Sequence, residues 1–517
     1  MDALLTSIGY ERWAISALLI IPMVGALIVA LVPERLAKTI AFTIALIEMI
    51  VSLGLWVQFD PAGPLMQFEA ARPWIPGWGI AYRVGVDGIS LMMVLLTTVL
   101  MPWTILASFG SIHRKERGYY ALMLAMVTGM LGVFVSLDLF LFYVMWEVML
   151  IPMYFIIGIW GGKDRLYASI KFFVYTMAGS LLMLVAILYL YFVGGRATGG
   201  GFTFSLSQIA LHSTVLPWHT QLWLFIAFFL AFAIKVPVFP FHTWLPDAHT
   251  EAPTAGSVIL AAVMLKMGTY GFIRFAVPLF PAVALHPTVK TVILVLAVVG
   301  ILYGALVAMV QPDFKRLVAY SSVSHLGFVM LGLWAVTVQS VQGALMVMIN
   351  HGLSTGALFL LIGMIYDRRH SRLIGDYGGI ARVMPMFAAL LTFAAFSSIA
   401  VPGTNGFIGE FLVLVGSYRT EPLAAALATI AVIFAAAYLL WALKRILYGP
   451  IVHPENESLV DLNGRELAVL APLVALMLWL GLAPGPVLRR MEPAAEAYVE
   501  RVQDITRQAD MARGDGQ

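Results

Sequence analysis

Six ionisable side chains stand alone within long apolar stretches of this sequence: Glu147, Lys235, Lys266, His325, His351 and Glu410. A charged side chain at the centre of a bilayer costs roughly 2.5–3.5 kcal/mol on insertion scales, and such residues usually mark an ion or proton path. Carboxyl, amine and imidazole groups all exchange protons. These residue types at these places therefore predict proton transfer inside a membrane.

Glu147 and Lys235 form the first predicted pair. Glu147 is the only charge in its apolar run, and about 14 Å of helical rise separates it from the outer end of that run. Pro237 and Pro240 follow Lys235 directly and should break the helix beside it, which frees carbonyl groups that could hold an ammonium. Two ordinary readings stay open: a neutral carboxyl in an apolar wall, and a lysine that extends to the inner surface.

Lys266, His325 and His351 come next along the chain. Lys266 is the only charge in a long apolar helix, and residues 317–366, which hold both histidines, contain no Asp, Glu, Lys or Arg. Histidine, with an ordinary pKa of about 6.5, suits proton exchange. The alternatives are a lysine that extends to a surface and histidines that serve only as hydrogen-bonded core residues.

Glu410 is the only charge in a run that is too long for one straight span. Pro402-Gly403 and Asn405-Gly406 lie in its middle and predict a second broken helix. The spacing from Glu147 to Lys235 is 88 residues, and that from His325 to Glu410 is 85. Two broken, charged helices at corresponding places indicate an internal repeat.

The elements that must position these residues are membrane spans. Fourteen apolar runs of about 20 residues are predicted to cross the bilayer. The fold class is therefore an all-α polytopic membrane protein with about 14 transmembrane helices. It contains two inverted five-helix repeats, each with a discontinuous helix. The expected parts are N-terminal helices in 1–115, the first repeat in 116–278, the second in 285–448, and a last helix with a soluble tail in 449–517.

Composition supports a membrane protein. Of the 517 residues, 61% are hydrophobic and 11% charged, whereas soluble domains are about 25% charged. The absence of cysteine excludes disulfides, iron–sulfur clusters, cysteine-ligated zinc and thiol catalysis in this chain. One alternating set of loops carries sixteen Lys and Arg, and the other carries six. The positive-inside rule therefore places both termini on the outer side.

A polar cluster follows the first predicted break: His242, Asp247, His249 and Glu251. The two histidines are seven residues apart with a proline between them, which matches no standard zinc spacing. The cluster favours a polar mouth that admits protons from the cytoplasm over a metal site.

Several segments resemble the antiporter-like membrane subunits of respiratory complex I, and most closely its subunit M branch. The matching segments are VGVDGISL (84–91), FYVMWEVMLIPMY (142–154), IKVPVFPFHTWLPDAHTEAPT (234–254), QPDFKRLVAYSSVSHLGF (311–328), INHGLSTGALF (349–359) and PGTNGFIGEF (402–411). In that branch the second broken helix carries a glutamate, as Glu410 does here, where sister subunits and antiporters usually carry lysine.

The resemblance implies a proton-translocating membrane-arm subunit of NADH:quinone oxidoreductase in a bacterial inner membrane. Glu147 and Lys235 would form the first half-channel, Lys266 the connector, and His325 and His351 the link to Glu410. It implies no cofactor, catalytic residue or metal in this chain. NADH, FMN, iron–sulfur clusters and quinone belong to partner subunits, which are antiporter-like neighbours and a peripheral redox arm. The alternatives are a subunit of a sodium/proton antiporter complex and a passive scaffold.

Overall fold

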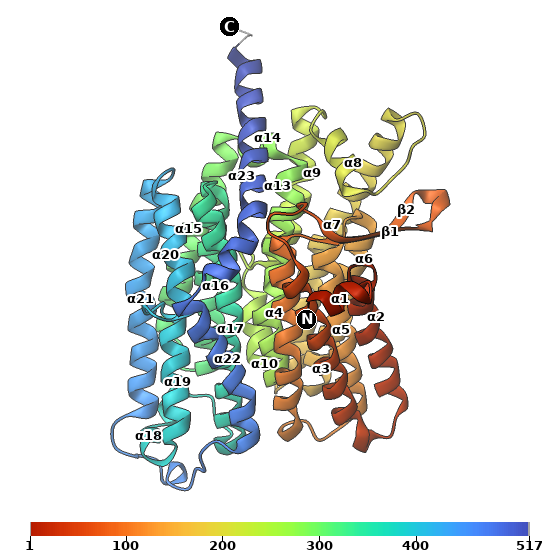
Figure 1. The fold of residues 1–517 in the computed structure, drawn as a ribbon. Coiled ribbons are helices and arrows are strands. Elements are labelled where there is room, and N and C mark those ends of the chain that lie inside the picture. The colour runs from red at the N-terminus through yellow and green to blue at the C-terminus, as the bar shows by residue number, and fades with distance from the viewer. Residues whose placement is uncertain (1, 515–517) are drawn as a thin grey trace.

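The structure, a computed structural model, describes residues 2–514. Long helices run roughly side by side in one bundle (Figure 1). Among the described residues, thirteen helices are long and apolar enough to cross a membrane. The one predicted span that is not among these thirteen, near residue 400, is a broken helix made of α19 (Pro385–Ser398) and α20 (Asn405–Tyr418). The prediction of an all-α polytopic membrane protein with about 14 spans is confirmed.

The N-terminal part supplies three spans. Its helices are α1 (Asp2–Ser7), α2 (Tyr10–Leu31), α3 (Glu34–Gln58), α4 (Gly88–Ala107) and the 3-10 turn η2 (Ser108–Gly110). Asp87 begins α4 because its side chain accepts hydrogen bonds from the backbone N–H groups of Ile89 and Ser90.

An antiparallel hairpin between α3 and α4 was not foreseen from the sequence. Strands β1 (Gln67–Ile75) and β2 (Ile80–Val86) pair around the 3-10 turn η1 (Pro76–Trp78). Gly79 closes the turn with φ of 64°, a left-handed conformation that glycine adopts without strain. The hairpin stands at the edge of the bundle, beyond the spans (Figure 1).

The next part contains the first break. Its elements are α5 (Glu116–Val135), α6 (Leu139–Trp160), α7 (Arg165–Ala197), α8 (Leu206–Ser213), α9 (Trp218–Lys235) and α10 (Trp244–Glu251). One more span follows, built from α11 (Thr254–Ile259), the π turn η3 (Leu260–Met264), α12 (Leu265–Gly271), the π turn η4 (Phe272–Ala276) and α13 (Val277–Leu279).

The remaining elements are α14 (Pro281–Ala284), α15 (Pro287–Met309), α16 (Phe314–Ala335), α17 (Val338–Arg369), η5 (Ile374–Asp376), α18 (Ile380–Val383), α19, α20, α21 (Pro422–Leu447), η6 (Pro454–Asn456), α22 (Gly464–Leu482) and α23 (Gly485–Gly514). The most apolar windows of residues 254–279 and 338–369 are wholly buried. These two spans, which carry Lys266 and His351, therefore form the centre of the bundle.

The two broken helices run in opposite directions. The chain descends from α9 to α10 but climbs from α19 to α20 (Figure 1). This arrangement is what two units of inverted topology require, since each unit contributes one broken helix. The bounds of the two units stay predictions.

Candidate proton pathway

The first break lies between α9 and α10. α9 ends at Lys235, and Pro237, which lacks an N–H group, prevents the helical ladder from continuing. The carbonyl of Ile234 accepts a hydrogen bond from the Trp244 indole at 2.8 Å. The predicted break is present, and one carbonyl beside it is already satisfied by α10.

Lys235 is fully buried, and its ammonium does not contact the freed carbonyls that the sequence suggested. Its hydrogen bond among the described residues goes to the sulfur of Met149 at 3.6 Å. The rings of Trp146 and Phe172 lie 5.5 Å away, within cation–π range. Aromatic faces and a polarisable sulfur therefore hold this charge.

Glu147 lies on α6, between the two α6 residues that contact Lys235. Tyr143 and Ser180 flank its carboxylate, and one carboxylate oxygen has no hydrogen-bond partner in the part of the chain that the structure describes. Glu147 and Lys235 interact electrostatically, but they do not form an ion pair in this structure. The first pair is near but disengaged.

Lys266 occupies the middle of its span, between the two π turns. Its ammonium donates to the carbonyl of Ala261 at 2.6 Å and lies 2.6 Å from Nδ1 of His351. Extra-wide turns of this kind are frequent at functional sites, because they displace helical carbonyls from their usual partners. Lys266 is thus in direct contact with His351.

His325 continues the chain to Glu410. The rings of His351 and His325 are 5.5 Å apart between centroids. Nδ1 of His325 lies 2.9 Å from Oε1 of Glu410. All three residues are at most 7% exposed. The structure therefore brings four of the six predicted residues, from α12, α16, α17 and α20, into one buried row.

The second break is locked by polar contacts. Ser397 donates to the side chain of Asn405, and Asn350 of α17 donates to the Asn405 carbonyl at 2.6 Å. Gly406 must be glycine, since a Cβ there would lie 2.0 Å from the carbonyl oxygen of Ser397. These contacts fix α20, and with it Glu410, against α17.

The first pair and the row that begins at Lys266 approach each other where α12 packs on α9. A Cβ added at Gly268 would lie 2.9 Å from the Phe232 carbonyl and 3.0 Å from Cβ of Lys235. The missing side chain lets the two backbones approach closely. Gly268 thereby brings the helix of Lys266 next to the residue at the first break.

The polar cluster after the first break forms ion pairs that sequence reasoning missed. Asp247 accepts from Lys171 at 2.7 Å, and Glu251 accepts from the backbone N–H of Asp164 at 2.8 Å. His249 is fully buried and stacks on Phe359.

Basic residues from later in the chain reach the same place. Lys315 donates to the Ala252 carbonyl, and Arg372 lies 3.9 Å from Glu251. Two cavities of about 200 and 290 Å³ both have Glu251 in their walls. The side chains that complete this polar cluster lie far apart in sequence, so no local motif could have revealed them.

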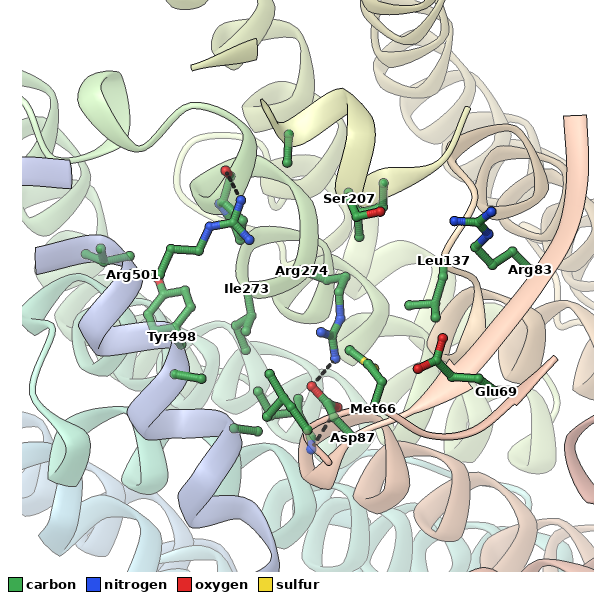
Figure 2. A pocket seen from close by; sticks show the side chains of 18 residues that line it. Met66, Glu69, Arg83, Asp87, Leu137, Ser207, Ile273, Arg274, Tyr498 and Arg501 are labelled. Atoms are coloured by element: carbon green, nitrogen blue, oxygen red, sulfur yellow. Dashed lines mark hydrogen bonds and ion pairs between the residues drawn. The ribbon is translucent and has the colours of Figure 1, made fainter. Parts of the chain in front are cut away.

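A larger cavity of about 450 Å³ opens at the opposite end of the span that carries Lys266 (Figure 2). Arg274 forms an ion pair with Asp87 at its floor and donates to the Tyr270 hydroxyl at 3.1 Å. Burial and the nearby charge of Arg274 lower the pKa of Arg501, on α23. The Asp87–Arg274 pair ties the outer end of this span to α4.

Comparisons with known proteins agree with this geometry. Residues 136–435 match the family model described as "NADH:quinone oxidoreductase/Mrp antiporter, TM". The chain is 45% identical to NADH-quinone oxidoreductase subunit M of Rhodobacter capsulatus, over 94% of this chain and 96% of that protein. It is 40% identical to NADH-ubiquinone oxidoreductase chain 4 of Marchantia polymorpha, over 94% and 97%.

A solved structure has the same fold. A chain of respiratory complex I from Thermus thermophilus with bound NADH superposes with a TM-score of 0.85 at 33% identity, and the match covers 94% of this chain and 99% of that one. Relatives of this identity and coverage establish family membership. The chain belongs to the NADH:quinone oxidoreductase/Mrp antiporter transmembrane family, in the branch of subunit M and its mitochondrial chain 4 relatives.

Proposed function

We propose that this subunit carries protons across the membrane along Glu147, Lys235, Lys266, His351, His325 and Glu410, driven by redox chemistry in other subunits of an NADH:quinone oxidoreductase. The observation that carries the proposal is the buried row from Lys266 to Glu410, with contacts of 2.6 and 2.9 Å at its two ends. Ionisable groups in such a row are costly inside a membrane unless they serve an ion path.

The first half works as a switch between Glu147 and Lys235. An ammonium close to a carboxylate favours its ionised form, and withdrawal of that ammonium favours proton uptake. The disengaged arrangement, with Lys235 held by Met149 and two aromatic rings, corresponds to the state in which Glu147 takes up a proton. Movement of Lys235 towards Glu147 would release it again.

The second half passes the proton onward through imidazole rings. Lys266 gives a proton to Nδ1 of His351, and that ring releases another from Nε2, which has no partner among the described residues. His325 receives it and delivers it to Glu410 at 2.9 Å. Each transfer within the row moves one proton between neighbouring groups, so the total charge of the row stays unchanged.

The assembly follows from the family. NADH, FMN, iron–sulfur clusters and quinone are proposed for partner subunits, and this chain for the membrane arm beside other antiporter-like subunits, as a translocase without a redox group. The excess of Lys and Arg in one set of loops supports a bacterial inner-membrane orientation with both termini outside.

Sodium/proton exchange is the competing function, because the matched family also includes Mrp antiporters. It would use the same residues without electron transfer. Glu410, rather than lysine, on the second broken helix favours the oxidoreductase. Dependence of transport on sodium and not on NADH would favour the antiporter.

The test is NADH-driven proton uptake by inverted vesicles that carry Glu147→Ala, with assembly checked on a native gel. We expect an assembled complex whose pumping and coupled NADH oxidation are lost. The matched control is Glu34→Ala, which removes an exposed carboxylate at the first residue of α3. This variant should pump normally. Unchanged pumping in Glu147→Ala would refute the proposed path.

A further inference from the structure

Glu48 is a buried carboxyl that the proposed path does not use. It lies on α3, ten residues before the end of a 25-residue span, which is about 15 Å of helical rise. The residue is 2% exposed, while its neighbours Ile47 and Ile50 are 47% and 64% exposed. Glu48 therefore points into the bundle at mid-membrane depth and not towards lipid.

Neither carboxylate oxygen of Glu48 has a hydrogen-bond partner among the described residues. The charged residues of the helices packed on α3 lie at helix ends. They are Asp2 on α1, Glu11 and Arg12 on α2, and Glu116 and Arg117 on α5, while α4 has none. On α3 itself the basic residues are Arg35 and Lys38, and Lys38 pairs with Glu116.

An ionised carboxylate with no counter-charge is very costly in such surroundings. In these surroundings the neutral, protonated acid is the form of Glu48 with the lower free energy. An apolar side chain of similar volume would serve a purely structural role without the cost of a buried carboxyl. An ionisable residue inside a span is therefore a functional candidate by default.

A polar seam lies one turn from Glu48. Ser52, four residues on, is on the same helical face and is hydrogen-bonded to the hydroxyl of Thr98 on α4 at 2.7 Å. Pro102 in α4 has no N–H group, so the Thr98 carbonyl lacks its usual helical donor. Hydroxyl and carbonyl oxygens thus gather one helical turn from Glu48.

The other face of α4 touches Gly352, the residue that follows His351 on α17. A Cβ added at Gly352, next to His351, would lie 3.0 Å from Leu96 of α4 and 3.1 Å from the Ala262 carbonyl. Leu96 and Thr98 are two residues apart and point to roughly opposite sides of the helix. The seam at Glu48 is therefore one helix width from the Lys266–His351 contact.

We propose that Glu48 is a further proton-binding site of this subunit, which takes up a proton as the neutral acid and releases it during turnover. The step is balanced, since one proton and one carboxylate give one carboxylic acid, and the proton comes from the path across α4. The inference rests on the proposed function, because the path supplies and consumes the proton.

The experiment compares Glu48→Gln with Glu147→Gln in the assembled complex. Two quantities are measured: protons taken up per NADH oxidised in inverted vesicles, and the infrared band of protonated carboxyl groups. We expect Glu48→Gln to lose one carboxylic band and to lower the proton-to-NADH ratio, while Glu48→Asp restores both. Glu69→Gln, an exposed carboxyl on the hairpin, should change neither.

The outcomes separate the two proposals. A normal ratio and an unchanged band in Glu48→Gln, with pumping lost in Glu147→Gln, would overturn the role of Glu48 alone. Normal pumping in both variants would overturn the path itself. If Glu48→Gln does not assemble, Ser52→Ala decides, because removal of the neighbouring hydroxyl should shift the carboxylic band, and an unshifted band would contradict the proposal.

Discussion

The two broken helices use the same device with exchanged partners. At the first break a lysine ends α9, and its carboxylate partner, Glu147, is on the unbroken helix α6. At the second break the carboxylate of Glu410 is on α20, and its basic partner, His325, is on the unbroken helix α16. The first pair is disengaged, while the second is in contact at 2.9 Å.

In the proposed path, this difference lets one chain hold two stages of proton transfer at the same time. A lysine on a broken helix has a long, flexible stem, so it can leave its carboxylate for the aromatic rings of Trp146 and Phe172. Glu410 is fixed by an α20 that Asn350 and Ser397 hold through Asn405. In the proposed path the first half would therefore move, and the second would conduct.

The largest loss of stability should come from breaking the Asp87–Arg274 ion pair, which ties the span of Lys266 to α4. Asp87→Asn leaves Arg274 without its counter-charge in a nearly buried site. Removal of one partner of a buried pair costs about 3–5 kcal/mol. The denaturation midpoint of the detergent-solubilised complex measures this loss. Glu69→Gln, which lines the same cavity without an ion pair, is the control, and equal midpoints would show that the anchor is dispensable.

A smaller effect should separate the two carboxylates. Glu410→Gln removes a hydrogen bond between ionisable groups and should cost about 1.5–3 kcal/mol. Glu147→Gln removes no ion pair and should cost less. Thermal unfolding of the two variants measures the difference. Equal losses of stability in the two variants would mean that Glu147 and Glu410 are both paired in the native protein. This result would contradict the difference between the two breaks.

The smallest effect concerns the fixation of α20. Asn350→Ala removes the donor to the Asn405 carbonyl and should cost about 1 kcal/mol. Ser354→Ala, whose hydroxyl donates to the Asn350 carbonyl one turn earlier in α17, should change the unfolding temperature less. A shift in Ser354→Ala as large as that in Asn350→Ala would show that this contact does not hold the second break.

Local signals in the sequence were enough to predict the spans, both breaks and the charges beside them. Pro237 and Gly403 act on the backbone within a few residues, so their effect can be read without tertiary structure. The sulfur contact of Lys235 could not be foreseen, because it joins residues 86 positions apart in the chain. The hairpin is formed by neighbouring segments, but its first strand shows no regular alternation of buried and exposed side chains that would have indicated a strand. Glu48 is likewise the only charge between Lys38 and Asp60, but it was not foreseen as a site, because only the fold shows that it points inward.

The most direct test of the pathway is NADH-driven proton uptake by the assembled complex with Lys266→Ala. Lys266 joins the two halves through His351, and proton-transfer groups contribute on the order of 10²–10⁴-fold to a rate. We expect pumping to fall by at least the lower of these factors, while the complex with Lys38→Ala, a half-exposed lysine near a helix end, pumps normally. Pumping at the wild-type rate in assembled Lys266→Ala would contradict the proposed pathway.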